Sequence, residues 1–146
     1  MLRGNYAAKI DDKARLKIPN AFRALVEKTH GAELFVTSLT GEFVRIYLMP
    51  VWLALEERLA RAPSTLPARN RFLDRVNYFG QAAEIDGQGR VLIHQRLRES
   101  AGMAGEVDVL GAVDRLDVWN HDRLVAKMLS DPFTDDDARS LSELGI

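Results

Sequence analysis

Apolar and polar residues alternate on both sides of a short polar segment near the N-terminus. The alternating apolar positions are Ala8, Ile10, Leu16 and Ile18. This period of two predicts a pair of half-buried strands joined by a tight turn. Pro19 then ends the second strand, and apolar residues recur at the spacing of one helix face, at Phe22, Leu25 and Val26. The pattern therefore predicts a unit of strand, turn, strand and short helix.

The same unit occurs twice in the chain. Residues 7–23 align without gaps to residues 82–98, at a constant offset of 75 positions, and seven of the 17 aligned residues are identical. So much identity in so short a segment predicts a tandem duplication. The second turn, Asp86-Gly87-Gln88-Gly89, has the composition of a tight turn because glycine reaches positive φ at no steric cost.

The first turn has Ala14 where the second has Gly89. Because alanine disfavours a positive φ, we expect a type I turn around Asp12 and Lys13, with a negative φ at Ala14. Arg15 would then point in a different direction from its counterpart Arg90.

Each unit continues with an apolar hairpin and a further helix. The expected hairpins join residues 34–36 to 43–47 and residues 107–110 to 116–119. The first following helix begins near Pro50 and is expected to bury Trp52, Leu55 and Leu59. The second is capped by Asn120 and is expected to bury Leu124, Val125 and Met128.

The order of these elements predicts an α+β protein made of two repeats and two smaller segments. A helix opened by Pro67 is expected between the repeats, with Phe72, Leu73 and Val76 on one side. The tail is acidic, and we expect it to fray or to dock weakly. The expected boundaries are residues 1–62 for the first repeat, 63–78 for the helical linker, 79–130 for the second repeat and 131–146 for the tail.

Composition excludes several classes of site. Of 146 residues 47% are hydrophobic and none is cysteine, so disulfides, thiolate zinc sites, iron–sulfur clusters and cysteine nucleophiles are excluded. The chain has no apolar run of about 18 residues and no secretory leader at its N-terminus, so we expect a cytoplasmic protein without a membrane partner. His30, His94 and His121 lie far apart, so neither a metal site nor another cofactor is expected.

Charge is distributed unevenly, although the formal net charge is only −1. Residues 1–25 contain six basic and two acidic side chains, whereas residues 131–146 contain five acidic side chains and one basic side chain. A basic head indicates that this end of the chain meets an anionic partner. The alternative is that both ends are simply solvated surfaces.

Each turn carries an aspartate and an arginine four positions apart, Asp11 with Arg15 and Asp86 with Arg90. A tight turn brings the two side chains to one edge, where the carboxylate can accept from backbone N–H groups or hold the guanidinium. A guanidinium held in this way can meet a phosphate or the edge of a guanine through two parallel hydrogen bonds. The alternative is that both pairs are salt bridges that only stabilise the turns.

The paired motifs, together with the opening Met1-Leu2-Arg3-Gly4 and the runs 15–19 and 89–93, resemble those of the MraZ family of regulators. The resemblance extends to about Leu129. It implies a fold similar to the AbrB-like swapped-hairpin β-barrels with peripheral helices, and a ring-shaped homo-oligomer. It also implies nucleoid-associated binding to short direct repeats of double-stranded DNA upstream of the division and cell-wall gene cluster, including the protein's own promoter. The sequence departs from the family pattern at Ala14, where glycine is usual, and at His94-Gln95, where proline is usual.

The resemblance makes the turns the expected DNA contacts. The expected DNA-binding residues are Arg3, Lys9, Lys13, Arg15, Lys17 and Arg90, and the residues expected to organise the turns are Asp11, Asp86 and Gly89. Residues 79–100 carry three basic and three acidic side chains, so we expect repeat one to supply most of the affinity.

Two other classes of function stay open. A barrel that binds a small molecule or a peptide would need an enclosed apolar pocket. An antitoxin-like partner of another protein would usually have one hairpin and a long disordered tail, unlike this chain. No arrangement of catalytic residues is recognisable in the sequence, so an enzyme is not expected.

Overall fold

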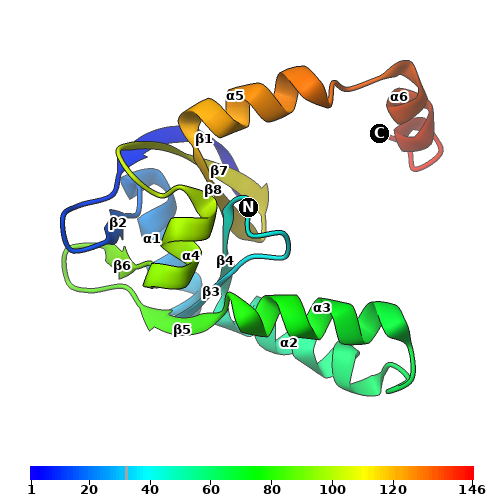
Figure 1. Ribbon diagram of the computed structural model, residues 1–146, viewed down its shortest axis with the longest axis horizontal. Coiled ribbons are helices and arrows are strands. Elements are labelled where there is room, and N and C mark those ends of the chain that lie inside the picture. Colours follow the sequence, from blue (N-terminus) through cyan, green and yellow to red (C-terminus); the bar gives the residue numbers. More distant parts are fainter. Residues whose placement is uncertain (32) are drawn as a thin grey trace.

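The computed structural model describes residues 1–31 and 33–146, without the side chains of residues 29 and 30. Figure 1 shows a mixed α+β chain, which confirms the predicted class. The first repeat and the segment that follows it contain β1 (Leu2–Lys9), β2 (Arg15–Lys17), α1 (Asn20–His30), β3 (Glu33–Thr37), β4 (Val44–Leu48), α2 (Met49–Arg61) and α3 (Pro67–Tyr78). The remainder contains β5 (Gln81–Glu84), β6 (Arg90–Leu92), α4 (Gln95–Ala101), β7 (Glu106–Val113), β8 (Arg115–Asn120), α5 (His121–Ser130) and α6 (Asp135–Ser142).

The strands of the two repeats are interleaved. The larger sheet has the order β1-β7-β8-β4-β3-β5, with antiparallel neighbours throughout. The first strand of repeat one thus lies beside β7 of repeat two, and the first strand of repeat two lies beside β3 of repeat one. Strands β1, β3 and β4 of repeat one are equivalent to β5, β7 and β8 of repeat two. The order of equivalent strands is therefore the same when it is read from either edge, and the two repeats build one sheet together.

A second, two-stranded sheet joins the repeats at the turns. In it β2 pairs with β6, and Leu16 lies directly opposite its counterpart Val91, both fully buried. The Ile18 N–H donates to the Gly89 carbonyl at 2.8 Å, and the Ile93 N–H donates to the Ala14 carbonyl at 3.0 Å. Because these two bonds link equivalent positions in opposite directions, the repeats are related by an approximate two-fold axis.

This pairing corrects the prediction that the strands beside each turn pair mainly with each other. Across the first turn the structure gives a single bridge, between Ile10 and Leu16. On either side of that bridge the two strands separate. Strand β1 pairs with β7 at eight positions, and β2 pairs with β6. The longer antiparallel partner satisfies more backbone groups than a short local hairpin would.

The same approximate axis passes through the middle of the large sheet, between β4 and β8. There Arg45 lies directly opposite Asp117, and each is the half-buried residue between two buried apolar neighbours. The Arg45 Nε donates to the Asp117 carboxylate at 3.0 Å. Burial lowers the pKa of Arg45, but the hydrogen bond and charge of Asp117 outweigh this effect and raise it. An ion pair between Arg45 and Asp117 therefore lies where the approximate two-fold axis passes through the sheet.

The main core lies between the sheets and the helices α1 and α4. Phe22 and Val26 of α1 are buried, with Leu25 packed against the same core, which confirms the predicted helix face. Leu97 and Ala101, their counterparts on α4, are buried in the same cluster.

A smaller core lies under α2 and α3, which Figure 1 shows side by side at one edge of the sheet. Trp52 is buried, as predicted, and stacks on Phe35 with ring centroids 4.2 Å apart, whereas Leu55 and Leu59, which were also predicted to be buried, are half-buried. Val76 is buried as well, and its carbonyl accepts from the Thr37 hydroxyl at 2.6 Å. The helix predicted to open at Pro67 is α3, with proline in its first turn.

The C-terminal helices agree only partly with the prediction. The Asn120 side chain caps α5 by accepting from the Arg123 N–H at 3.1 Å, as expected. Leu124 is buried, but Val125 and Met128 are exposed, so the prediction that they are buried was wrong. The reason is that α5 leaves the sheet after its first turn, as Figure 1 shows. The tail forms α6 and lies exposed beyond the end of α5.

Candidate nucleic-acid interface

The first turn is organised by the carboxylate of Asp11. Its Oδ1 accepts from the backbone N–H groups of Lys13 and Arg15 at 3.0 and 2.8 Å. Its Oδ2 accepts from the Arg15 Nε at 2.9 Å. The Asp11 N–H in turn donates to the Arg15 carbonyl at 2.9 Å, which closes the turn. One side chain therefore fixes both the backbone of the turn and the direction of the arginine.

The second turn is built in the same way. The Asp86 Oδ1 accepts from the N–H groups of Gln88 and Arg90, both at 2.9 Å, and Oδ2 accepts from the Arg90 Nε at 3.0 Å. The Asp86 N–H donates to the Arg90 carbonyl at 2.9 Å. Matching distances in both turns show that the duplication repeats the geometry as well as the motif.

These hydrogen bonds favour the ionised form of both aspartates. The backbone N–H of Arg15 is the main cause that lowers the pKa of Asp11, and the backbone N–H of Arg90 does the same for Asp86. The guanidinium of each arginine lowers the pKa further. Each arginine thus stands beside a full negative charge at neutral pH.

The backbone at Ala14 contradicts the predicted difference between the turns. Ala14 has φ 63° and Gly89 has φ 78°, so both positions are left-handed and the expected negative φ at Ala14 was wrong. A left-handed alanine costs roughly 1–2 kcal/mol. Against this stand the carboxylate network and the bond from the Ala14 N–H to the Asp11 carbonyl, 3.1 Å long, which matches the one from Gly89 to Asp86. Arg15 and Arg90 are consequently held alike.

Pairing of β2 with β6 places cations from both repeats on one face, which we call the β2–β6 face. Leu16 and Val91 point into the core, so the alternate residues Arg15, Lys17, Arg90 and Leu92 lie on the opposite side. Lys17 is directly opposite Arg90. Like charges in facing positions of a sheet are destabilising by themselves. An anionic partner would turn this cost into an attraction.

The guanidinium groups on this face retain donors for such a partner. Among the residues that the structure describes, no hydrogen bond engages Nη1 or Nη2 of Arg15 or of Arg90. About a quarter of each arginine side chain is exposed, 27% for Arg15 and 26% for Arg90. Each guanidinium is therefore oriented through Nε and can still present its outer edge.

The remaining predicted cations divide into two groups. Lys9 and Lys13 are exposed beside the first turn, at the end of β1 and within the turn itself. Arg3 is also exposed but lies near the other end of β1, opposite Ala112, whereas Lys9 is opposite Glu106. The extended strand separates Arg3 from Lys9 by about 20 Å. The structure thus puts Arg15, Lys17 and Arg90 on one face and Lys9 beside the same hollow as Lys17, whereas Lys13 lies in the first turn and Arg3 lies apart.

Arg23 is a contributor that the sequence analysis missed. It lies on α1 of repeat one, yet its Nη2 donates to the Gly87 carbonyl in the turn of repeat two at 3.0 Å. A Cβ added at Gly89 would lie 2.8 Å from the Arg23 Cδ, so the side chain packs directly on that turn. Its identity with Arg98 in the aligned segments was the signal that could have pointed to it.

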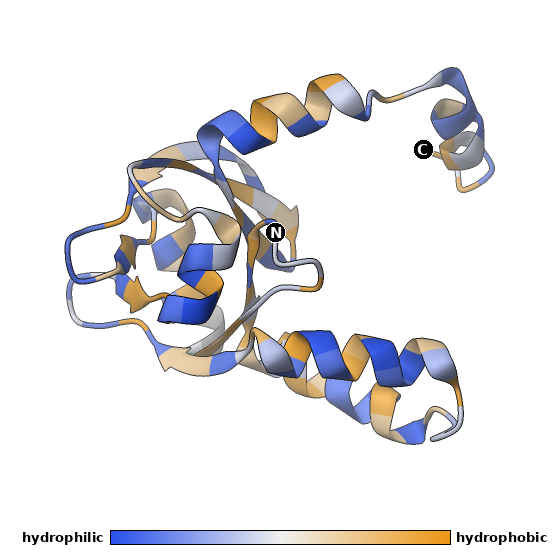
Figure 2. Cartoon of the chain, viewed as in Figure 1, coloured by the Kyte–Doolittle hydropathy of each residue, from blue (hydrophilic) through white to orange (hydrophobic). Residues whose placement is uncertain are grey.

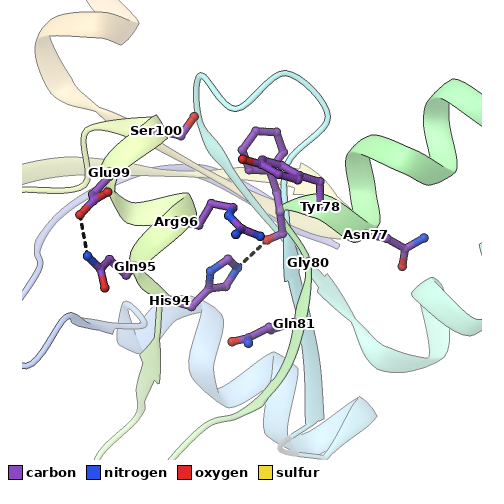
Figure 3. A pocket seen from close by; sticks show the side chains of 10 residues that line it. Asn77, Tyr78, Gly80, Gln81, His94, Gln95, Arg96, Glu99 and Ser100 are labelled. Atoms are coloured by element: carbon purple, nitrogen blue, oxygen red, sulfur yellow. Dashed lines mark hydrogen bonds between the residues drawn. The ribbon is translucent and has the colours of Figure 1, made fainter.

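An open hollow of about 850 Å³ lies between α3 and α4 and is shown in Figure 3. Polar side chains line much of it. His94, whose Nε2 lies 2.6 Å from the Phe79 carbonyl, and Arg96, stacked over the Tyr78 ring at 4.5 Å, are two of them. This is not the enclosed apolar pocket expected of a small-molecule barrel.

Two further properties concern the part of the chain that the structure describes. Among these residues there is no cluster of three or more side chains suited to a metal ion. None of the described helices is both long enough and apolar enough to cross a bilayer.

Known proteins resemble this chain along its whole length. A family described as "MraZ protein, putative antitoxin-like" matches residues 80–144. "Transcriptional regulator MraZ" of Acidobacterium capsulatum is 42% identical over 146 residues, and its namesake from Koribacter versatilis is 45% identical over 147 residues. A third, from Caldicellulosiruptor bescii, is 34% identical over 148 residues. In each comparison all of this chain and all of the relative are covered.

Proposed function

The chain belongs to the MraZ family of transcriptional regulators, and on that premise we propose that it binds double-stranded DNA through the β2–β6 face and the two turns beside it. The family membership also confirms the prediction that the chain is not an enzyme, because these relatives are named as regulators.

The observation that carries the proposal is the facing pair Lys17 and Arg90. The two residues come from different repeats, and the fold places them opposite each other although separation would cost less. Phosphate groups of a DNA backbone supply the negative charge that makes such a cluster favourable, and the release of counterions makes the binding sensitive to salt.

The aspartates give the arginines their role in this proposal. A guanidinium that is held through Nε has lost much of its rotational freedom before DNA arrives, so less entropy is lost on binding. Its two outer nitrogens match the O6 and N7 atoms of guanine or two phosphate oxygens. Arg15 and Arg90 would read or clamp the DNA, Lys9, Lys13 and Lys17 would contact phosphates, and Arg3 would reach a more distant phosphate.

The finer parts of the proposal concern the operator and the assembly. We infer short direct repeats upstream of the division and cell-wall gene cluster, including this protein's own promoter, and association with the nucleoid. We also infer a ring of identical subunits built on a swapped-hairpin barrel, with repeats at residues 1–62 and 79–130. The interleaved strands and the β2–β6 pairing support the barrel, since neither repeat completes its sheet alone.

An electrophoretic mobility shift with the DNA upstream of the protein's own gene tests the proposal. We expect a shift that shuffled DNA of equal composition competes for poorly and that weakens as salt rises. Arg15→Ala combined with Arg90→Ala should abolish the preference, whereas Arg58→Ala combined with Arg61→Ala on α2 should keep it. Equal binding of both DNAs by the wild-type protein would show that the proposed specificity is wrong.

A further inference from the structure

The C-terminal arm, residues 125–146, exposes six large apolar side chains to solvent. Figure 2 shows hydrophobic residues along α5 and again after α6. The exposed fractions of these side chains run from 40% to 78%, at Val125, Met128, Leu129, Phe133, Leu144 and Ile146. An isolated helix as short as α6, with eight residues, is marginal in water. Several large apolar side chains exposed along one short segment indicate an interaction site.

Three of the five negative charges of the arm lie together at the start of α6. Asp135, Asp136 and Asp137 form its first turn, where Asp137 completes a capping box with Thr134. The apolar residues Leu144 and Ile146 lie at the opposite end, after the last turn. A surface that receives α6 therefore needs an apolar hollow bordered by positive charge.

The chain carries such a surface on α3, which we call the α3 groove. It is an open hollow of about 470 Å³ with an apolar floor formed by Leu39, Ala68, Phe72 and Phe79. Arg71 and Arg75 also line it, one turn apart on α3 and both exposed. The groove thus offers positive charge opposite the acidic first turn of α6 and an apolar surface for the apolar residues that follow α6.

Within one copy the arm and the groove do not meet. Figure 1 shows α6 beyond the far end of α5, on the opposite side of the molecule from α2 and α3. A contact between two different surfaces of identical subunits is heterologous, and such contacts close into rings when the rotation permits.

We propose that α6 of one copy docks in the α3 groove of a neighbouring copy, with its acidic first turn against Arg71 and Arg75 and with Leu144 and Ile146 in the hollow. This inference rests on the proposed self-assembly and names the surfaces that make it. It is independent of the DNA contacts, because neither surface includes a residue of the β2–β6 face.

Charge-reversal variants of the full-length protein test this contact. Their mass is measured by light scattering after size-exclusion chromatography. One variant carries Arg71→Glu and Arg75→Glu, and the other carries Asp135→Lys and Asp136→Lys, which leaves Asp137 for the capping box. Each variant alone should fall from the oligomer toward the 16.4 kDa protomer. Mixing the two variants should restore the oligomer, because each then offers the charge that the other lacks. Arg58→Glu with Arg61→Glu on α2, outside the groove, is the matched control and should keep the wild-type mass.

The possible results separate this inference from the proposed function. If both variants keep the wild-type mass, or if mixing restores nothing, the α6 contact is wrong while self-assembly through another surface stands. If the wild-type protein is monomeric at all concentrations, both the contact and the proposed ring are wrong. The mobility shift with Arg15→Ala and Arg90→Ala tests DNA binding separately in every case. Circular dichroism of each variant shows whether a change in mass reflects lost assembly or lost folding.

Discussion

The two turns have the same geometry but different charge. Their aspartates make the same three hydrogen bonds, with lengths that agree within 0.1 Å, and Ala14 and Gly89 share a left-handed backbone. The first repeat, however, has lysines at three positions where the second has other residues. In the alignment of the repeats, Lys9 corresponds to Glu84, Lys13 to Gln88 and Lys17 to Leu92.

This comparison separates the residues that stabilise the turn from the residues that are available to bind a ligand. The aspartate and the arginine, which both turns share, hold the backbone, whereas the three positions that differ in charge are exposed to solvent in both repeats. Since geometry no longer distinguishes the repeats, charge alone should decide which of them contributes more to binding an anionic partner.

The largest expected effect comes from removing the arginines singly. Arg15→Ala should weaken DNA binding by about 1–3 kcal/mol per contact, or roughly 5- to 150-fold, because a held guanidinium is lost. Arg90→Ala should cost less, since fewer cations surround it. Fluorescence anisotropy with labelled upstream DNA measures both, and the oligomeric mass of each variant should match the wild type. A larger loss for Arg90→Ala would reverse the ranking of the repeats.

Converting the second turn to the charge of the first should sharpen the comparison. Glu84→Lys, Gln88→Lys and Leu92→Lys together should tighten binding and steepen its dependence on salt, by up to about 0.9 in the logarithmic slope for each new phosphate contact. Glu56→Lys with Glu57→Lys on α2 serves as the control for net charge. An unchanged slope in the turn variant would mean that the second turn does not face DNA.

Exchange of the left-handed residues should affect stability in opposite directions. Gly89→Ala should destabilise by about 1 kcal/mol or more, because alanine is strained at positive φ and its Cβ would lie 2.8 Å from the Arg23 Cδ. Ala14→Gly should be neutral or stabilising by less than about 1 kcal/mol, since relief of strain is offset by added entropy of the unfolded chain. Urea unfolding measures both. Destabilisation by Ala14→Gly would show that the strain at this position is negligible.

The smallest effect concerns acid stability. The pKa values of Asp11 and Asp86 are lowered by the N–H groups of the turns, so their stabilising effect is complete above the unfolded value of about 3.9 and is lost as pH falls through the folded pKa. Asp11→Asn and Asp86→Asn should each flatten the fall in melting temperature below about pH 4, and to an equal degree. Asp12→Asn is the control, because its carboxylate makes no hydrogen bond with the residues that the structure describes. Unequal flattening would mean that the two turns differ in solution.

Much of the fold was predictable because its signals are local. Periodicity located the helix face at Phe22 and Val26, Pro67 marked the start of α3, and Asn120 marked the cap of α5. The duplication was visible as identity at a fixed offset. Each of these signals depends on residues only a few positions apart, or on direct comparison of two segments.

The rest depended on contacts between distant segments. The pairing of β2 with β6 placed Lys17 opposite Arg90, and no periodicity in either repeat specifies that register. Ala14 adopts a left-handed backbone against its own preference because the Asp11 network outweighs it. Val125 and Met128 have the spacing of a buried face, but the direction in which α5 leaves the sheet decides their exposure.

The ion pair of Arg45 and Asp117 has a consequence for self-recognition. A chain with only one repeat would have to place this central position against its own copy, as two arginines or as two aspartates in a half-buried site. Joining the repeats in one chain allowed the position to hold opposite charges. The opposite charges therefore favour pairing of β4 with β8 over pairing of either strand with its own copy.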